Sequence, residues 1–510
     1  MPSFNSNQLT HLYVNMRHAC HTYLILPSQH DPSWVIKACA TDHEKRFSFP
    51  GFSILLPLRS GPQLDYHQGT IQPLTPDPEP VMTYRPVISI LILNLCLCLP
   101  SQAADWAQFL GSTGQGVSGE TDLPTQWSPD EGIRWSIPLA GQSNSSPAVT
   151  SKRIDLTTQK KDQSLWVISI DRKTGKVLRE TRVGQGGLAA KGAANLYAHR
   201  HNAATPSPIA DEDHVWAFFG TGLLVCLQAN TGQIIWQRDL VKDYGAYDIT
   251  FGMGSSPRLW GNLLYVSCLT KGASYVVALD KATGKQAWKT DRKLPAKDDG
   301  PDAYSTPAIF QHNQHSALLI SGSDHVTAYD LNNGKQIWIS SGLDIASPYG
   351  RIIASPVSAA GVVVATSANP GGGGLGHVMA LGTDGHGDVT QSQQLWKISK
   401  ATPDSSTPVC YQGKVYLVTD KGIASCLDLQ SGKQHWQKRL PQGPYHASLV
   451  AGDDRVYFLS TAGTCTVVSS KNDGKVLSTN KLAGTFYATP AMSDGIVYLR
   501  AYERLYAIGK

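Results

Sequence analysis

Short apolar runs alternate with polar turns along residues 132–510. Between Ala278 and Trp288 an apolar strand leads into a polar turn at Thr283–Lys285, and the next strand carries Trp288. The turn residue Gly284 can adopt the positive φ that a tight hairpin requires. The same pattern recurs with the glycine–tryptophan pairs Gly232 and Trp236, Gly334 and Trp338, and Gly432 and Trp436. We interpret Leu178 and Leu477 as replacements for the tryptophan in two weaker copies. Repetition at this period predicts a propeller or a solenoid.

Each copy begins with a second repeated motif, which consists of two small residues and a proline. We call this motif the Pro mark. Proline has no backbone N–H to donate, which suits the first position of an innermost strand. An alternating apolar strand, a third strand, the glycine turn and a fourth strand follow, which is the pattern of a propeller blade. The marks end at Pro147, Pro206, Pro257, Pro307, Pro356, Pro408 and Pro490, and Ala447–Leu449 is a copy without the proline.

The eight marks predict an all-β, eight-bladed propeller of four-stranded antiparallel blades. The last blade stops after its third strand, at Lys510. A fourth strand with its own tryptophan, Trp135, is available at Gly132–Leu139. We therefore expect the two ends of the propeller to pair and close the ring, which removes the exposed edges of an open array. Trp396 joins the set of tryptophans that dock one blade on the next.

The first hundred residues follow a different pattern. Residues 1–81 show no sustained period, and we interpret them as a non-native extension of the gene model or a disordered segment. Residues 82–103 have one positive charge, an apolar run too short to span a membrane and small residues before Ala104, as in a signal peptide. The alternative is a real extension followed by an internal anchor. Residues 104–131 then form an irregular leader across the surface, before the propeller at 132–510.

Composition limits the partners and the chemistry. The net charge is +5 with no basic run, so we expect no nucleic-acid partner. The mature chain has no predicted transmembrane span, and we expect a monomer. Its five cysteines have no zinc-ligand spacing, and we expect buried free thiols and no metal. These cysteines are Cys226, Cys268, Cys410, Cys426 and Cys465.

The repeated turn and tryptophan resemble the tryptophan-docking motif of the PQQ-like β-propellers. That superfamily includes quinoprotein dehydrogenases and the propeller lipoprotein of the β-barrel assembly machinery. Short segments of the sequence, such as His199–Asn202, are similar to segments of exported PQQ-like propellers of planctomycete-type bacteria. The resemblance implies the fold and export to the periplasm or medium. The motif residues themselves are structural.

A quinoprotein enzyme would hold PQQ with Ca²⁺, an aromatic floor and an aspartate base. The pair of adjacent cysteines that such dehydrogenases commonly carry is missing from the mature chain, as is a haem C-x-x-C-H motif. We therefore predict no cofactor and keep PQQ with Ca²⁺ as the alternative. Asp298, Asp299 and Asp302 could hold calcium, but we interpret them as a solvated charge cluster.

The candidate site lies on the face that carries the links between blades and the loops between second and third strands. Long, chemically varied loops gather there, and binding residues are common on loops over a rigid scaffold. For the histidines of His199–His201 the alternative is a solvated loop. The residues expected to contact a ligand at the mouth of the central channel are His199, Arg200, His201, Asn202, Tyr304, Arg351, Tyr445, His446 and Tyr487.

These residues predict a non-catalytic exported scaffold that binds an envelope protein or a glycan through its loop-rich face. The alternatives are a PQQ-dependent oxidoreductase and a glycan-binding or glycan-processing protein with its site in the central funnel. No serine, histidine and aspartate triad can be recognised, because sequence distance says little about proximity in a β array.

Overall fold

The computed structural model describes residues 105–510, apart from residues 113, 189–199, 373, 442 and 472, together with five short strands near the N-terminus. The chain divides into two units, Met1–Leu95 and Cys96–Lys510. The predicted signal peptide, residues 82–103, lies outside the described residues. No helix in the described part of the chain has the length and apolar character needed to cross a membrane.

The first unit contains one sheet with the strand order β1-β2-β3-β5-β4, in which only β3 and β5 pair in parallel. Its strands are β1 Tyr13–Asn15, β2 Thr22–Pro27, β3 Trp34–Ala38, β4 Phe47–Phe49 and β5 Phe52–Ile54.

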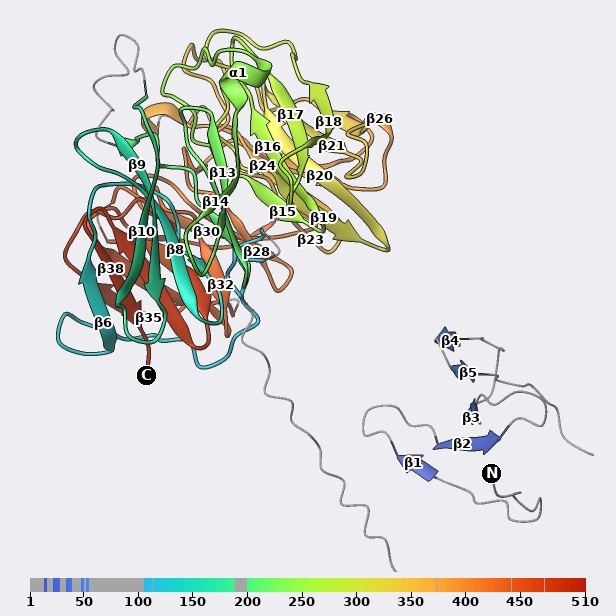
Figure 1. Cartoon of the computed structure of the whole chain (residues 1–510). Helices are drawn as coiled ribbons and strands as arrows, with labels where there is room; N and C mark the ends of the chain where they lie inside the picture. Colours follow the sequence, from blue (N-terminus) through green and yellow to red (C-terminus); the bar gives the residue numbers. More distant parts are fainter. Residues whose placement is uncertain are drawn as a thin grey trace, which may run out of the picture. The chain divides into compact units, whose positions relative to one another are not determined.

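The second unit is the predicted propeller (Figure 1). Within its described residues, eight sheets each contain four antiparallel strands, and the fourth sheet gains a short fifth strand. Blade 1 comprises β7 Ala148–Val149, β8 Arg153–Gln159, β9 Ser164–Asp171 and β10 Val177–Gln185. Blade 2 comprises β11 Ile209–Ala210, β12 His214–Phe218, β13 Leu223–Gln228 and β14 Ile234–Asp239. Blade 3 comprises β15 Arg258–Trp260, β16 Leu263–Cys268, β17 Tyr275–Asp280 and β18 Gln286–Asp291.

The remaining blades follow the same order from the channel outward. Blade 4 comprises β19 Ala308–His312, β20 His315–Gly322, β21 His325–Tyr329 and β22 Gln336–Ser340, and β26 Gly387–Asp388 pairs in parallel with its outer edge. Blade 5 comprises β23 Val357–Ala359, β24 Val362–Thr366, β25 Val378–Gly382 and β27 Gln394–Ile398. Blade 6 comprises β28 Val409–Tyr411, β29 Lys414–Val418, β30 Ile423–Asp428 and β31 Gln434–Arg439. Blade 7 comprises β32 Val450–Gly452, β33 Arg455–Leu459, β34 Thr464–Ser469 and β35 Val476–Lys481.

Blade 8 closes the ring as the sequence predicts. Its strands are β36 Ala491–Ser493, β37 Ile496–Ala501, β38 Arg504–Ile508 and the N-terminal β6 Ile133–Pro138. Strand β6 pairs antiparallel with β38, so that Trp135 lies opposite Ala507, and Figure 1 shows the two strands side by side. Closure in this way leaves no blade without its outer strand.

Five tryptophans lie against the turn glycine of the following blade and so join one blade to the next. A Cβ atom added to Gly284 would lie 2.7 Å from the ring of Trp236, and one added to Gly334 would lie 2.3 Å from that of Trp288. The indole Nε1 of Trp288 donates to the carbonyl of Leu331 at 2.9 Å. Trp135, Trp396 and Trp436 contact Gly175, Gly432 and Gly474 in the same way. These contacts fit the docking role that the sequence predicts, whereas Trp338 in blade 4 lies opposite Gly387 of β26.

The interpretation of Leu178 and Leu477 is wrong by one position. The tryptophan position is four residues after the turn glycine, and Arg179 and Ser478 occupy it in blades 1 and 7. Side chains alternate along a strand, so Leu178 points outward and is 50% exposed. Arg179 instead donates to the backbone carbonyls of Ala229 and Asn230 in blade 2.

The leader is not a surface segment. Trp106, Leu110 and Leu123 are at most 2% exposed. The leader crosses one end of the central channel, and its hydrogen bonds reach blades 1 to 5, 7 and 8. These bonds involve Trp106 with Val149, Ala107 with Ala210, Gln108 with Leu259, Gln115 with Ile309 and Ser358, Gly116 with Ala451, and Glu120 with Gly495. An irregular segment can be buried because the innermost strands and side chains satisfy its polar groups.

The five cysteines that follow residue 104 are buried and free, as predicted. Cys226 lies opposite Trp236 in blade 2, and Cys426 lies opposite Trp436 in blade 6. They occupy the same place in different blades and fill the core as small apolar residues.

Candidate functional site

A cavity of about 2750 Å³ opens on the loop-rich face of the ring. Its wall comes from the links between blades and from the loops between second and third strands, such as Lys160–Gln163 and Tyr502–Glu503. Phe109 of the leader also lines the cavity. Because the leader closes the opposite end of the channel, the cavity is a funnel with one mouth.

A ring of eight hydroxyl groups surrounds the narrow end of the funnel. In each blade the residue before the first-strand proline, or before Leu449 in blade 7, is Ser or Thr. Its backbone N–H donates to the equivalent hydroxyl of the following blade at 2.8–3.2 Å, and the eighth bond returns to the first blade. The members of this hydroxyl ring are Ser146, Ser207, Ser256, Thr306, Ser355, Thr407, Ser448 and Thr489.

The hydroxyl ring also corrects the position of the Pro mark in blade 2. In blade 2 the equivalent pair is Ser207 and Pro208, two residues after the position given by the Ala204–Pro206 mark. Thr205 instead contacts His201, whose Nδ1 lies 2.8 Å from the threonine hydroxyl. A second proline in the segment Thr205–Pro208 concealed the register.

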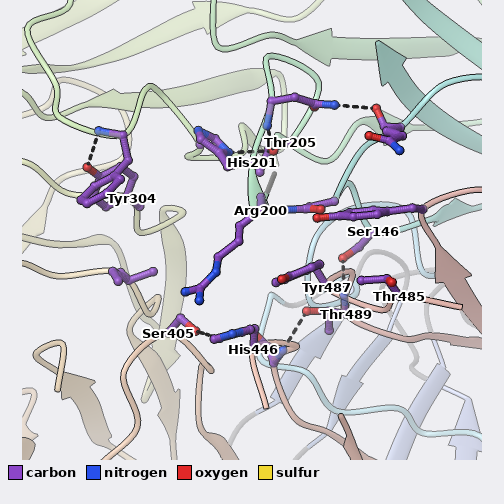
Figure 2. Close-up of a pocket in the computed structure, with 18 of the residues that line it drawn as sticks. Ser146, Arg200, His201, Thr205, Tyr304, Ser405, His446, Thr485, Tyr487 and Thr489 are labelled. Carbon is purple, nitrogen blue, oxygen red and sulfur yellow. Dashed lines mark hydrogen bonds between the residues drawn. The ribbon is translucent and has the colours of Figure 1, made fainter. Parts of the chain in front are cut away.

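One wall of the funnel carries a stack of three aromatic rings. His446 stacks on Tyr487 with centroids 5.3 Å apart, and Tyr487 stacks on Tyr502 at 5.4 Å. Figure 2 shows the Arg200 side chain extending into the cavity toward His446 and Ser405. We call Arg200 and the three stacked rings the stacked cluster.

A second aromatic group comes from blades 3 and 4 and the links beside them. The guanidinium of Arg351 lies 5.0 Å from the ring centroid of Phe251, and the Tyr304 hydroxyl accepts the backbone N–H of Phe251 at 3.3 Å. All three residues line the funnel. Cation–π contact and the hydrogen bond fix the orientation of these side chains.

Buried ionisable groups lie beneath the stacked cluster. Nδ1 of His446 is 3.4 Å from Oδ2 of Asp420 and 3.1 Å from the hydroxyl of Ser405. Burial, with a smaller contribution from nearby Asp404, raises the pKa of Asp420 to about 7. Burial, together with the charge of Arg200, lowers the pKa of His446 to about 4. At neutral pH a neutral imidazole therefore meets a carboxyl group that is partly protonated, and the contact is not a full ion pair.

This trio does not have the geometry of a nucleophilic triad. In such a triad the serine and the acid contact opposite nitrogens of the imidazole, so that a proton passes from one side to the other. Here Ser405 and Asp420 both approach Nδ1. His446 therefore cannot transfer a proton from Ser405 toward Asp420.

His201 is held in one orientation by its neighbours. Its Nε2 lies 3.2 Å from the carbonyl of Gly252, which assigns the ring proton to Nε2, since a carbonyl can only accept. Burial lowers the pKa of His201 to about 4. The imidazole is therefore neutral at physiological pH.

The structure brings most of the predicted site residues together. Lining the funnel are Arg200, His201, Asn202, Tyr304, Arg351, His446 and Tyr487. His199 lies outside the described residues. Tyr445 is placed elsewhere: it is 0% exposed, packs in the core of blades 6 and 7 and donates to the carbonyl of Pro441 at 2.9 Å. Neighbouring residues of an extended link point in opposite directions, so His446 and Tyr445 could not both face the channel.

Sequence reasoning missed Asp404, Asp420, Tyr502 and the hydroxyl ring. The ring had a usable signal, because a Ser or Thr precedes the first strand in every copy. Asp420 had none, since it lies in a short loop between Thr419 and Lys421 that resembles an ordinary turn.

The interpretation of Asp298, Asp299 and Asp302 as a solvated cluster is wrong for Asp302. Asp302 is 0% exposed and accepts the N–H of Thr250 at 2.8 Å. Asp299 accepts from Lys271 at 2.9 Å. Within the described residues, no three His, Cys, Asp or Glu side chains are close enough to hold a metal ion together.

Comparison with known proteins finds a matching family and similar structures. A family model described as outer membrane protein assembly factor BamB matches residues 117–267, 181–438 and 385–472. The BamB protein of Salmonella typhimurium is 31% identical over 296 residues, which are 54% of this chain and 67% of the relative.

Two solved structures share the fold at low sequence identity. BamB from Moraxella catarrhalis aligns with a TM-score of 0.52 and 13% identity, over 74% of this chain and 99% of that structure. A europium-containing methanol dehydrogenase aligns with a TM-score of 0.56 and 11% identity, over 80% of this chain and 98% of that structure. At these identities the likeness concerns the fold alone, whereas the family model matches more than half of the sequence. The chain therefore belongs to the family described as outer membrane protein assembly factor BamB.

Proposed function

We propose that this chain is an exported, non-catalytic binding protein that holds an envelope protein in its funnel. The observation that carries the proposal is the single-mouthed funnel with an arginine and aromatic side chains on facing walls. Arginine and tyrosine contribute much of the binding energy at protein interfaces. Ser405, His446 and Asp420 meanwhile lack the arrangement needed for a proton relay.

Family membership supports an envelope partner. The relatives are named as factors for the assembly of outer membrane proteins. A role of this kind requires export, in agreement with the signal peptide predicted at residues 82–103. We therefore propose a periplasmic or secreted location.

The described residues do not fit PQQ with Ca²⁺. Calcium takes six to eight oxygen ligands, usually with several carboxylates among them. The funnel offers Asp404 and Asp420 beside one another, but Asp404 accepts the N–H of Asn369 at 2.8 Å and Asp420 is partly protonated at neutral pH. Tyr487 is stacked between two other rings, so neither of its faces is open to a quinone.

A comparison of two variants tests the proposal. Arg200 is exposed in the funnel, and Lys285 is exposed on a glycine turn. Tagged wild type, R200A and K285A are purified from the cell envelope, and the co-purifying proteins are quantified by mass spectrometry. We expect a partner that is depleted at least tenfold with R200A and retained with K285A.

Other outcomes would contradict the proposal. Equal recovery of every partner with R200A and wild type would place binding outside the funnel. Binding of wild type but not R200A on a glycan array, without an envelope protein partner, would favour the glycan alternative. PQQ-dependent dye reduction after addition of PQQ and Ca²⁺ would favour the oxidoreductase.

A further inference from the structure

Arg258 is a buried cation without a counter-charge. It is the first residue of β15 and is 1% exposed. Its Nε donates to the carbonyl of Pro307 at 2.9 Å, whereas Nη1 and Nη2 have no hydrogen-bond partner among the described residues. Burial lowers its pKa to about 9, and no neighbouring acid opposes that shift. Because arginine stays charged at this pKa, the guanidinium needs a partner to offset its burial.

The guanidinium lies in the central channel, between the hydroxyl ring and the leader. Arg258 follows the ring member Ser256 by two residues and precedes Leu259, whose backbone N–H and carbonyl bond to Gln108 of the leader. The Ser256 hydroxyl accepts from Ser207 beside blade 2, whereas the guanidinium donates to Pro307 beside blade 4. The leader covers the guanidinium. A Cβ atom added to Gly114 would lie 2.6 Å from Cζ of Arg258, 2.7 Å from Nη2 and 2.9 Å from Nη1. These similar distances indicate that Gly114 covers the flat face of the guanidinium and leaves its edge free to donate.

The surrounding layer is apolar. In the other seven blades, the residue two positions after the ring hydroxyl is aliphatic, and each is buried. These residues are Ala148, Ile209, Ala308, Val357, Val409, Val450 and Ala491. Arg258 is thus the charged member of a layer that offers no carboxylate within the described residues.

Within the part of the chain that the structure describes, the two terminal nitrogens of the guanidinium carry donors without acceptors, and no neighbouring acid offsets the charge. A buried positive charge with free donors is the environment of an anion. Arg258 does not line the funnel, so a bulky ligand in the funnel cannot reach it, and the occupant must be small.

We propose that the central channel binds a chloride-sized anion at Nη1 and Nη2 of Arg258, between the hydroxyl ring and the leader. The anion neutralises the guanidinium and allows the leader to pack against it. The site is separate from the funnel that we propose for partner binding. The stability of the packed leader therefore depends on the halide concentration.

Thermal unfolding of the full chain in chloride and in gluconate, at constant ionic strength, tests the site. A ligand that binds only the folded state stabilises it as its concentration exceeds the dissociation constant. We expect the folding equilibrium constant to rise up to tenfold for each tenfold increase in chloride above that constant. In R258M, which keeps an unbranched side chain without charge, the chloride dependence should disappear.

R292M is the matched control. Arg292 is also 1% exposed, but its Nη1 donates to the carbonyl of Gly322 at 3.1 Å and its Nη2 to the hydroxyl of Thr327 at 3.1 Å. R292M should keep the chloride dependence of the wild type. A wild type that is indifferent to chloride, or an R258M variant with the same dependence, would overturn the proposal.

Bromide provides a second measurement that does not depend on the folding of any variant. Crystals of the wild type grown in bromide should show an anomalous peak within hydrogen-bonding distance of Nη1 and Nη2 of Arg258. A map with water there and no anomalous peak would rule the anion out.

Discussion

At the residue scale, the same glycine and tryptophan positions both shape the turns and join the blades. Gly284 adopts φ = 67°, and the ring of Trp236 lies where its side chain would be. Trp288, which is 7% exposed, in turn covers Gly334. A substitution at either position therefore affects a local turn and the contact between two blades.

Truncation of the docking tryptophan should be costly. We expect W288A to lower the free energy of unfolding by about 3–5 kcal/mol, as for other large aromatic side chains in packed cores. G284V should cost more than a typical surface change, because it forces a β-branched residue to positive φ and against Trp236. Chemical denaturation measures both. Unchanged midpoints would contradict the docking role.

The buried carboxyl group in the funnel should make stability depend on pH. The pKa of Asp420 is raised in the folded state to about 7 from 3.8, so the unfolded chain loses this proton first as the pH rises. The folded state is therefore penalised progressively between about pH 4 and pH 7. D420N should remove this penalty and be more stable than wild type by about 2–4 kcal/mol above pH 7, with little difference below pH 4.

The difference between wild type and D420N isolates Asp420 from the histidines. His201 and His446, whose pKa values are lowered to about 4, reduce stability in the opposite direction, as the pH falls from 6.5 to 4. D384N, at an exposed aspartate, should unfold like wild type at every pH. If D420N and wild type also unfold alike at pH 4 and at pH 8, Asp420 is ionised in the folded state and our assignment fails.

At the element scale, the two N-terminal elements have different tasks. Strand β6 closes the ring, and the leader closes one end of the channel. Leader residues also fill the junction between blades 7 and 8, where Ser478 replaces a docking tryptophan. There Ser478 donates to the carbonyl of Thr125, and Asn480 accepts the N–H of Trp127 at 3.0 Å.

Two truncations should separate these tasks. Deletion up to Leu139 exposes the edge of β38, and we expect aggregation because an unpaired apolar edge recruits other chains. Deletion up to Thr125 keeps β6, so this chain should stay monomeric but lose stability with the burial of Trp106, Leu110 and Leu123. Light scattering and thermal unfolding distinguish the outcomes. A shorter deletion that melts like wild type would mean that the leader does not pack in the channel.

A single substitution probes the leader without truncation. G114A places a methyl group at φ = 71° and 2.6 Å from Cζ of Arg258. We expect it to lower the melting temperature by several degrees, whereas G119A should not, because a Cβ atom at Gly119 meets no atom within 4 Å and its φ is not positive. Equal melting of G114A and wild type would show that the leader does not rest on Arg258.

At the scale of the whole molecule, the periodic part of the architecture could be predicted from the sequence. Blade number and ring closure follow from the Pro marks and from Trp135, because each blade repeats the same local chemistry. The leader could not be predicted, since its hydrogen bonds with blades 1 to 5, 7 and 8 join residues far apart in the chain and have no period. Asp420 and Tyr445 illustrate the same limit within the site, because the direction of a side chain in a short loop or link depends on tertiary packing.

The export of the protein is also a property of the whole molecule. Expression from Met82 should give an envelope or secreted protein that begins at Ala104, because the charged start, the apolar run and the small residues before Ala104 follow the order of a signal peptide. N-terminal sequencing by mass spectrometry checks the cleavage site. Peptides from residues 1–81 in the native protein would contradict this interpretation.

The central claim is that one face of the ring binds and the other supports the scaffold. Site-specific photo-crosslinking in living cells tests it most directly, with a photoreactive residue at Tyr349, which lines the funnel and is 61% exposed, or at Lys285 on the glycine-turn face. We predict a discrete crosslinked envelope protein from position 349 and at least tenfold less of it from position 285. Equal crosslinking from both positions, or a crosslinked partner from position 285 alone, would contradict the account.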